Sequence, residues 1–223
     1  MGIPLSNAYT DTSKCIEDRV QGCQSRYYAV KGLGTQKQGL PPTVLSTLYK
    51  SVCITKITYG VEVMYIDNDD MDKLDKTQCR IAKSIQGLPV CVPNIACCAP
   101  LGWLSVESII DIARLLFLWR IMLLPWTNIY KRVLVYRMYQ IKSETTDTTK
   151  YRRANMLSVC RVLYSVATKY GLIDLLWENF ISLKPMCYNK WKRIVKATVT
   201  EFEHSRWVVS CPIYRSLQYY KLL

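Results

Sequence analysis

The chain has 223 residues, of which 50% are hydrophobic and 21% are charged, and this balance excludes a disordered chain. With 9 glycines and 9 prolines it has too few turn-forming residues for a sandwich or barrel, so the composition favours helices. The net charge of +13 indicates a polyanionic partner, either nucleic acid or an anionic membrane surface, unless the basic surface is merely solvated.

The basic charge is concentrated in the second half of the chain. Residues 1–100 carry 11 basic and 9 acidic side chains, whereas residues 101–223 carry 19 basic and 8 acidic ones. Residues 120–170 hold ten basic side chains and two acidic ones, Glu144 and Asp147. We therefore expect a polyanion to bind the second half of the chain.

In chain order, the first two predicted elements are helices. Residues 11–31 place apolar side chains at alternating steps of four and three, and Gly32 suits the left-handed position just after a helix. Residues 43–65 follow two prolines, which fit a first helical turn, and Tyr59 falls on their apolar face. Residues 52–59 are rich in β-branched side chains, so a strand is the alternative there.

The next two helices have clear start signals. Residues 67–70 offer capping oxygens and negative charge to a helix that ends at Gly87. Ser105 caps a further helix, which contains the longest apolar run of the chain, residues 109–124. Three charged side chains interrupt this run, so we predict a buried core helix and not a membrane span.

Four more helices are predicted in the second half of the chain. The first begins near Thr127 or Asn128 and continues past Tyr136. The polar residues 143–149 after it are the clearest linker in the sequence. Three further helical patterns cover residues 151–170, 174–183 and 189–207.

No catalytic or metal-binding pattern is recognisable in the sequence. Asp69 and Asp70 lack the aromatic residue that precedes the paired aspartates of reverse-transcriptase-class polymerases, and we predict that the acidic run at residues 67–70 caps a helix. Cys91, Cys97 and Cys98 lack the paired spacing of a structural zinc site. We therefore predict no catalytic residue, no cofactor and no metal.

The other cysteines lie singly within apolar patterns. Such isolated thiols are typical of small buried hydrophobic side chains in a reducing compartment. The first residues also lack a charged segment followed by an apolar core, as a signal peptide would have. We expect an intracellular protein of the nucleus or cytoplasm.

Basic and aromatic residues lie next to each other in the second half, as in Tyr130-Lys131-Arg132 and Lys190-Trp191-Lys192-Arg193. Cations neutralise phosphates, and aromatic rings stack on unpaired bases. Trp191 lies on an apolar helical stripe, so we assign it to the core. The predicted nucleic-acid contacts are Lys131, Arg132, Arg137, Lys150, Arg152, Arg153, Lys190, Lys192 and Arg193.

Several short motifs follow one another in the order found in a known family. They are Gly2-Ile3-Pro4-Leu5-Ser6, Lys31-Gly32-Leu33-Gly34, Thr58-Tyr59-Gly60-Val61-Glu62-Val63, Ile85-Gln86-Gly87-Leu88-Pro89, Leu101-Gly102-Trp103-Leu104-Ser105-Val106 and Lys169-Tyr170-Gly171-Leu172. Over nearly the whole chain, their order and spacing resemble the region after the palm in reverse transcriptases of non-LTR (LINE-type) retrotransposons.

The resemblance implies a thumb-like helical bundle at residues 1–125, which would grip the template–primer duplex. It implies a basic helical region at residues 126–223, which would bind element RNA and target DNA. The fingers and palm, with the catalytic aspartates, would lie upstream of Met1 and act as partners of this chain. No catalytic residue is therefore carried over from the family.

We thus predict an all-α chain that binds RNA, DNA or an RNA–DNA hybrid, without catalysis and without a membrane. Two alternatives stay open. The chain is part of an RNA-directed DNA polymerase and supports templated synthesis, or it is a helical scaffold that binds protein through apolar surfaces.

Overall fold

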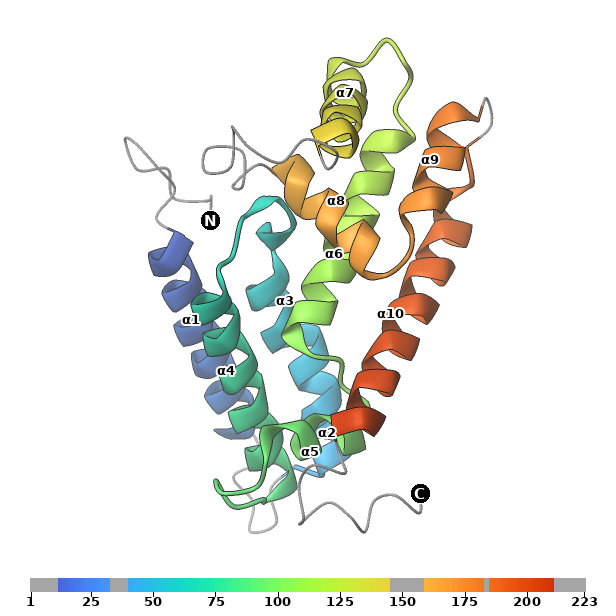
Figure 1. The fold of residues 1–223 in the computed structure, drawn as a ribbon. Helices are drawn as coiled ribbons and strands as arrows, with labels where there is room; N and C mark the ends of the chain where they lie inside the picture. Colours follow the sequence, from blue (N-terminus) through green and yellow to red (C-terminus); the bar gives the residue numbers. More distant parts are fainter. Residues whose placement is uncertain (1–11, 33–39, 145–158, 183–184, 211–223) are drawn as a thin grey trace. The chain divides into compact units, whose positions relative to one another are not determined.

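The computed structural model describes residues 12–32, 40–144, 159–182 and 185–210. Within these ranges the chain forms helices and no strand, which confirms the predicted all-α class (Figure 1). The α-helices are α1 (Thr12–Gly32), α2 (Pro42–Leu48), α3 (Ile54–Thr58), α4 (Asn68–Gln86), α5 (Asn94–Cys98), α6 (Val106–Met122), α7 (Ile129–Glu144), α8 (Val159–Lys169), α9 (Ile173–Ile181) and α10 (Tyr188–Ser210). A π-helical stretch, η1 (Tyr49–Cys53), and two short 3-10 helices, η2 (Val61–Val63) and η3 (Ala99–Leu101), connect some of them.

The chain divides into two compact units. Unit 1 comprises the described residues up to Val61, those of Ile66–Ile109 and those from Glu203 onward. Unit 2 comprises Glu62–Tyr65 and the described residues of Ile110–Phe202. The boundary predicted after residue 125 differs from this division, in which residues of α6 and of α10 belong to both units.

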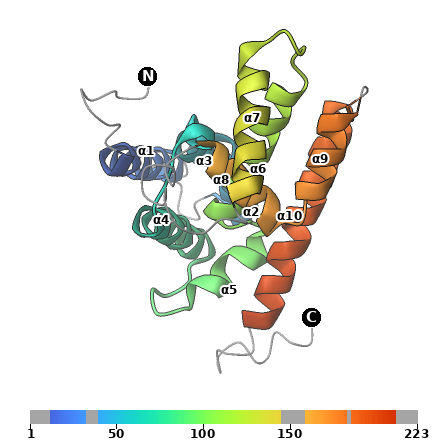
Figure 2. The same cartoon turned by 45° about the horizontal axis from the view of Figure 1, so that its top comes forward.

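In unit 1, α1 and α4 lie side by side (Figures 1 and 2), and α1 also packs against η1 and α3. Helix α1 buries Ile16 and Tyr27 on one face, as its apolar spacing predicts. Helix α4 buries Leu74 and Ile81 in the same way. Each such side chain stabilises the fold by about 1.5–3 kcal/mol through removal of apolar surface from water.

The predicted helix over residues 43–65 is shorter than expected and is interrupted. Helical backbone runs from Pro42 to Thr58, with the π-helical stretch η1 between α2 and α3, so the alternative strand is absent. Tyr59 then adopts an extended backbone, with ψ at 117°, and Gly60 has φ at 71°. The ring of Tyr59 is 71% exposed, so its placement on an apolar face was wrong.

The capping predictions have mixed outcomes. The carboxylate of Asp67 accepts the Asp70 N–H at 2.8 Å, and Gly87 ends α4 with φ at 66°. The Ser105 hydroxyl accepts the Ser108 N–H at 3.2 Å at the start of α6, as predicted. Gly32 is the last residue of α1 and does not have a positive φ, so its predicted left-handed position was wrong.

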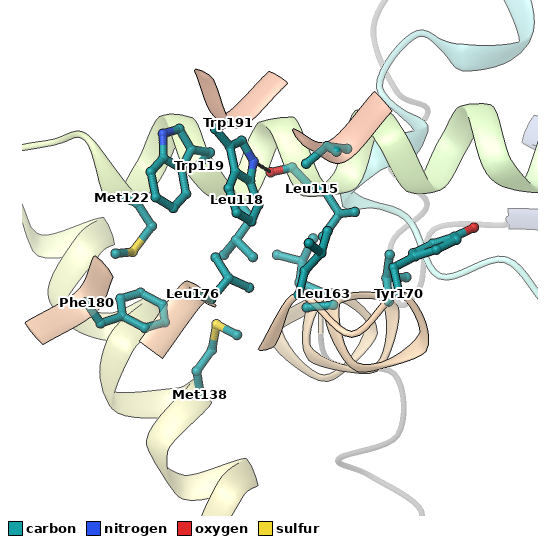
Figure 3. Close-up of a cluster of buried hydrophobic side chains, with 14 of the residues drawn as sticks. Leu115, Leu118, Trp119, Met122, Met138, Leu163, Tyr170, Leu176, Phe180 and Trp191 are labelled. Atoms are coloured by element: carbon teal, nitrogen blue, oxygen red, sulfur yellow. Dashed lines mark hydrogen bonds between the residues drawn. The ribbon is translucent and has the colours of Figure 1, made fainter. Parts of the chain in front are cut away.

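Unit 2 is organised around α6, whose apolar run is a buried core helix, as predicted (Figure 3). The indole rings of Trp119 and Trp191 stack with centroids 4.3 Å apart, and Trp191 Nε1 donates to the Leu115 carbonyl at 3.1 Å. Helix α7 contributes Met138 and α9 contributes Leu176 to the same core. Trp191 is fully buried, which agrees with its assignment to the core.

A buried ionic network lies beside this core. Asp111, 2% exposed, accepts hydrogen bonds from Lys169 Nζ at 2.9 Å and from the Tyr170 hydroxyl at 3.0 Å. Arg114 pairs with its other carboxylate oxygen at 3.3 Å and also donates to the Met64 carbonyl at 3.0 Å. The carboxylate of Asp111 is thus shared by two cations, and Arg114 also binds a backbone carbonyl, so Asp111 and Arg114 of the apolar run are accommodated within the fold.

Candidate nucleic-acid interface

Helix α7 presents an outer face of aromatic and basic side chains. Its inner face is fixed by Leu134 and Met138, which are one turn apart and buried in the core of unit 2. Of the other positions from 130 to 139, Lys131 is buried, Val135 is half-buried and the rest are exposed. Tyr130 is 71% exposed, Tyr136 61% and Tyr139 64%, so three rings of α7 are largely accessible.

Two arginines lie among these rings. The side chain of Arg132 is exposed and has no hydrogen bond or ion pair with any residue that the structure describes. Arg137 is exposed as well, and its Nη1 donates to Gln140 Oε1 at 3.2 Å. Along α7 no acidic residue precedes Glu144, so both guanidinium groups are available to an anion.

The first half of α10 presents a second, more strongly basic face. Trp191, Val195 and Val199 recur every fourth residue and are fully buried. Lys190, Lys192, Arg193 and Lys196 occupy exposed positions outside this stripe. Helical periodicity therefore separates one apolar stripe from four cations within two turns.

The four cations of α10 are not neutralised by their surroundings. None of them forms an ion pair or hydrogen bond with the described residues of the chain. The first acidic residue of α10 is Glu201, more than one turn beyond Lys196. Like charges this close repel one another, and a bound polyanion would relieve that repulsion.

Lys131 does not share this exposure. It is 6% exposed, its Nζ donates to the Leu124 carbonyl at 3.0 Å, and it lies 4.5 Å from the centre of the Trp126 ring. Burial lowers the pKa of its amine. The side chain thus holds the turn between α6 and α7 and is not presented to a phosphate, which its neighbourhood in the sequence did not reveal.

The structure describes some of the other predicted contact residues and leaves three of them outside the described ranges. Lys150, Arg152 and Arg153 lie outside the described residues. Arg132 and Arg137 on α7, and the basic residues on α10, belong to the same unit, since both helices bury their inner faces in one core. Lys196 was missed, although its spacing of four residues from Lys192 was the signal that could have identified it.

Two carboxylates of the acidic run at residues 67–70 make contacts within the fold at the start of α4. Asp70 is 2% exposed and binds Lys73 Nζ at 2.7 Å, while the Ser13 hydroxyl donates to it at 3.3 Å. Asp67 is occupied with the helix N-terminus. The carboxylates therefore serve the fold locally.

A group of three thiols was not recognised in the sequence. Cys97 and Cys98 were identified as neighbours, but the third sulfur near them is that of Cys79 on α4 and not that of Cys91, which is exposed. Nothing in the sequence spacing indicates this, because Cys79 approaches through the packing of α5 on α4. Within the described residues these three thiols are the candidate ligands for a metal ion.

In the described part of the chain, every helix is too short or too polar to cross a membrane. Comparison with models of protein families, with curated protein sequences and with solved structures finds no match to this chain.

Proposed function

We propose that the chain binds RNA, DNA or an RNA–DNA hybrid through phosphate contacts, with little base specificity. The observation that carries the proposal is the exposed face of α10, where Lys190, Lys192, Arg193 and Lys196 lie together without an acidic partner among the described residues. Lysine and arginine side chains bind phosphates and release the counterions that surround a nucleic acid, and this release drives association.

The outer face of α7 adds a second type of contact. Bases that are not paired can stack on exposed aromatic rings, and Tyr130, Tyr136 and Tyr139 offer such rings beside Arg132 and Arg137. Rings that stack on any base give little sequence preference. The two faces together favour a ligand with accessible phosphates and some single-stranded bases.

We further propose that the chain is the thumb and post-thumb part of a non-LTR retrotransposon reverse transcriptase. The ordered motifs of the sequence support this origin, and an all-α structure agrees with what the resemblance implies. In such a protein the basic helices would hold template and primer while the palm, on a preceding part of the polypeptide, carries out synthesis. The palm and fingers would then be its protein partners, inside the nucleus or cytoplasm.

A protein-binding scaffold is the second candidate function. Ile129 and Val133 are 59% and 50% exposed and lie one turn apart on α7. Adjacent exposed apolar side chains on one helix face favour a contact with another protein. A scaffold would not need the four cations of α10. Loss of those cations therefore distinguishes the two functions.

The test is fluorescence anisotropy of a labelled RNA–DNA hybrid titrated with the purified chain. The double variant Lys192→Ala/Arg193→Ala should bind on the order of tenfold more weakly at low salt, because two phosphate contacts are lost. The matched control, Lys76→Ala/Arg80→Ala on α4, removes two exposed cations from unit 1, one of them paired with Asp72, and should weaken binding much less. Equal affinity of both double variants would reject the α10 face as the binding site.

A further inference from the structure

Three cysteine thiols converge where α5 packs on α4 in unit 1. Cys79 Sγ lies 3.9 Å from Cys98 Sγ, and Cys98 Sγ lies 3.9 Å from Cys97 Sγ. All three sulfur atoms lie within 4.8 Å of one another. Cys97 is fully buried, whereas Cys79 and Cys98 are half-buried, so the group is accessible from one side.

The spacing of these sulfur atoms fits a shared metal ion better than a disulfide. Thiolates that bind one zinc ion at about 2.3 Å in tetrahedral geometry are about 3.8 Å apart. The two separations of 3.9 Å differ from this value by about a tenth of an ångström. A disulfide would require one pair to approach to about 2.0 Å, a movement of nearly 2 Å within packed helices.

The backbone around the thiols is held by side chains of α4. Gln86 Nε2 donates to the Cys97 carbonyl at 2.6 Å. Lys83 Nζ donates to the Asn94 side-chain oxygen at 2.8 Å and to the Val90 carbonyl at 3.0 Å. These bonds fix α5 against α4, so the three thiols are brought together without a metal, and little reorganisation would accompany binding.

Two nearby groups suit a cluster of thiolates. Gln78 Nε2 lies 3.8 Å from Cys98 Sγ and can donate to a sulfur that carries negative charge. The second is the ammonium group of Lys83, which binds the Asn94 side chain at the start of α5 at 2.8 Å. Three thiolates around a divalent ion carry a net charge of minus one, which Lys83 would offset.

We propose that Cys79, Cys97 and Cys98 form a three-thiolate site for a thiophilic metal ion of the Zn²⁺ type, with water as the fourth ligand. Each thiol loses its proton as its sulfur binds, so one ion displaces three protons and no electron is transferred. Thiolate ligands select soft and borderline ions over magnesium or calcium. The fourth position is open because two of the three sulfurs are half-buried and water can reach them.

Metal binding would have a structural consequence in unit 1. The site would join α5 to the second half of α4, because one ligand comes from α4 and two come from α5. An ion that binds the folded chain and not the unfolded chain raises the stability of the fold in proportion to the logarithm of its concentration. The site belongs to unit 1 and the four α10 cations belong to unit 2, and the inference does not depend on the proposed function.

The experiment uses the full chain, reduced and freed of metal, titrated with Co²⁺ as a spectroscopic probe. We expect one equivalent of Co²⁺ to produce thiolate-to-metal absorption and the strong visible bands of a tetrahedral site, and Zn²⁺ to displace it. Cys79→Ser and Cys98→Ser should bind Co²⁺ at least tenfold more weakly, and circular dichroism shows whether each stays helical. The matched control Cys91→Ser, an exposed cysteine outside the group, should bind as the original chain does.

Two results would overturn the proposal. One is a helical, reduced chain that gives no thiolate-to-cobalt absorption. The other is Co²⁺ binding that is as tight in Cys98→Ser as in the control Cys91→Ser. If Cys79→Ser is the better folded variant, the same comparison is made with it. Either result would assign the three thiols to packing between α4 and α5.

Discussion

At the scale of single residues, Asp75 is a carboxyl group on α4 whose surroundings oppose its charge. Its carboxylate accepts the Val106 N–H at 2.9 Å at the start of α6. Burial nevertheless raises its pKa from the ordinary 3.8 to about 6, and the nearby carboxylate of Glu107 adds to the shift. Ionised Asp75 is therefore less favourable in the folded chain than in the unfolded one.

This shift predicts a dependence of stability on pH. A carboxyl group with a raised folded pKa stabilises the fold while it is protonated, and this contribution is lost as the pH rises from about 4 through about 6. Asp75→Asn has no such loss, so relative to the original chain it should gain about 1–3 kcal/mol in the free energy of unfolding between pH 4 and pH 7.5. Urea denaturation of both proteins at the two pH values measures the difference, and a constant difference would contradict the assignment.

Residue-level predictions from sequence succeed where the interaction is local. The cap at Asp67 and the glycine that ends α4 are correct because partner and helix end lie within a few residues of each other. The burial of Lys131 was not predictable in this way, since it depends on the path of the turn after α6. Cys79 likewise meets its partners only after two helices have packed.

At the scale of helices, two glycines with different backbones allow a matched comparison. Gly87 ends α4 with φ at 66°, a conformation in which a side chain is strained, although a Cβ there would meet nothing within 4 Å. Gly32 lies in α1 without a positive φ, and a Cβ there would also meet nothing.

Gly87→Ala should therefore destabilise the chain by about 1 kcal/mol, while Gly32→Ala should leave the stability unchanged or raise it by up to about 1 kcal/mol. Thermal unfolding followed by circular dichroism compares the two variants under one condition. If alanine lowers the stability as much at position 32 as at position 87, the two glycines do not differ in backbone conformation as described.

The tyrosines of α7 define a prediction for single-stranded nucleic acid. If Tyr136 and Tyr139 stack on unpaired bases, changing both to alanine should weaken binding of a single-stranded RNA by about 1–3 kcal/mol for each base that loses its ring. Binding of a duplex, whose bases are already stacked, should change much less. Tyr59→Ala, which removes a ring of 71% exposure from unit 1, is the matched control.

Anisotropy titrations with single-stranded and duplex RNA make this comparison. A double variant that binds both forms as the original chain does would assign these rings to another role. Reduced self-association of the same variant, with nucleic-acid binding intact, would favour the protein-scaffold function.

At the scale of helices the sequence is informative wherever an apolar stripe is regular. The stripes of α1, α4 and α10 predict both the helices and the buried faces, because each helix packs on a single side. The interruption at η1 and the end at Thr58 were not predictable, since β-branched residues and a positive-φ glycine decide them only together with the surrounding packing. The division of the chain into units depends on contacts between segments far apart in the sequence. The apolar periodicity of single helices does not predict such contacts.

For the whole molecule, the distribution of charge is the feature that most limits the function. The second half of the chain carries 19 basic and 8 acidic side chains. On α10, the exposed side chains of Lys190, Lys192, Arg193 and Lys196 form no ion pair with a described residue, whereas Arg206 pairs with Glu107 and Glu203. Such a field attracts polyanions over distances of about a Debye length, near 10 Å at moderate salt.

The proposed origin as part of a reverse transcriptase gives a separate prediction for the whole molecule. The proposal assigns synthesis to the palm, so the chain with magnesium, a primed template and nucleotides should not extend the primer. A polymerase that joins these residues to its palm supplies the positive control. Templated extension by the purified chain would support the alternative of an active polymerase and would refute a purely binding role.

The salt dependence of binding tests the central claim most directly. For the full chain and a labelled RNA–DNA hybrid, the logarithm of the association constant should fall linearly with the logarithm of salt concentration. If the four cations of α10 all contact phosphates, the slope should be about −3 to −4, and Lys192→Ala/Arg193→Ala should reduce it by about 2. An association constant that stays the same across the salt range, or a slope that the double variant leaves unchanged, would contradict binding through this basic face.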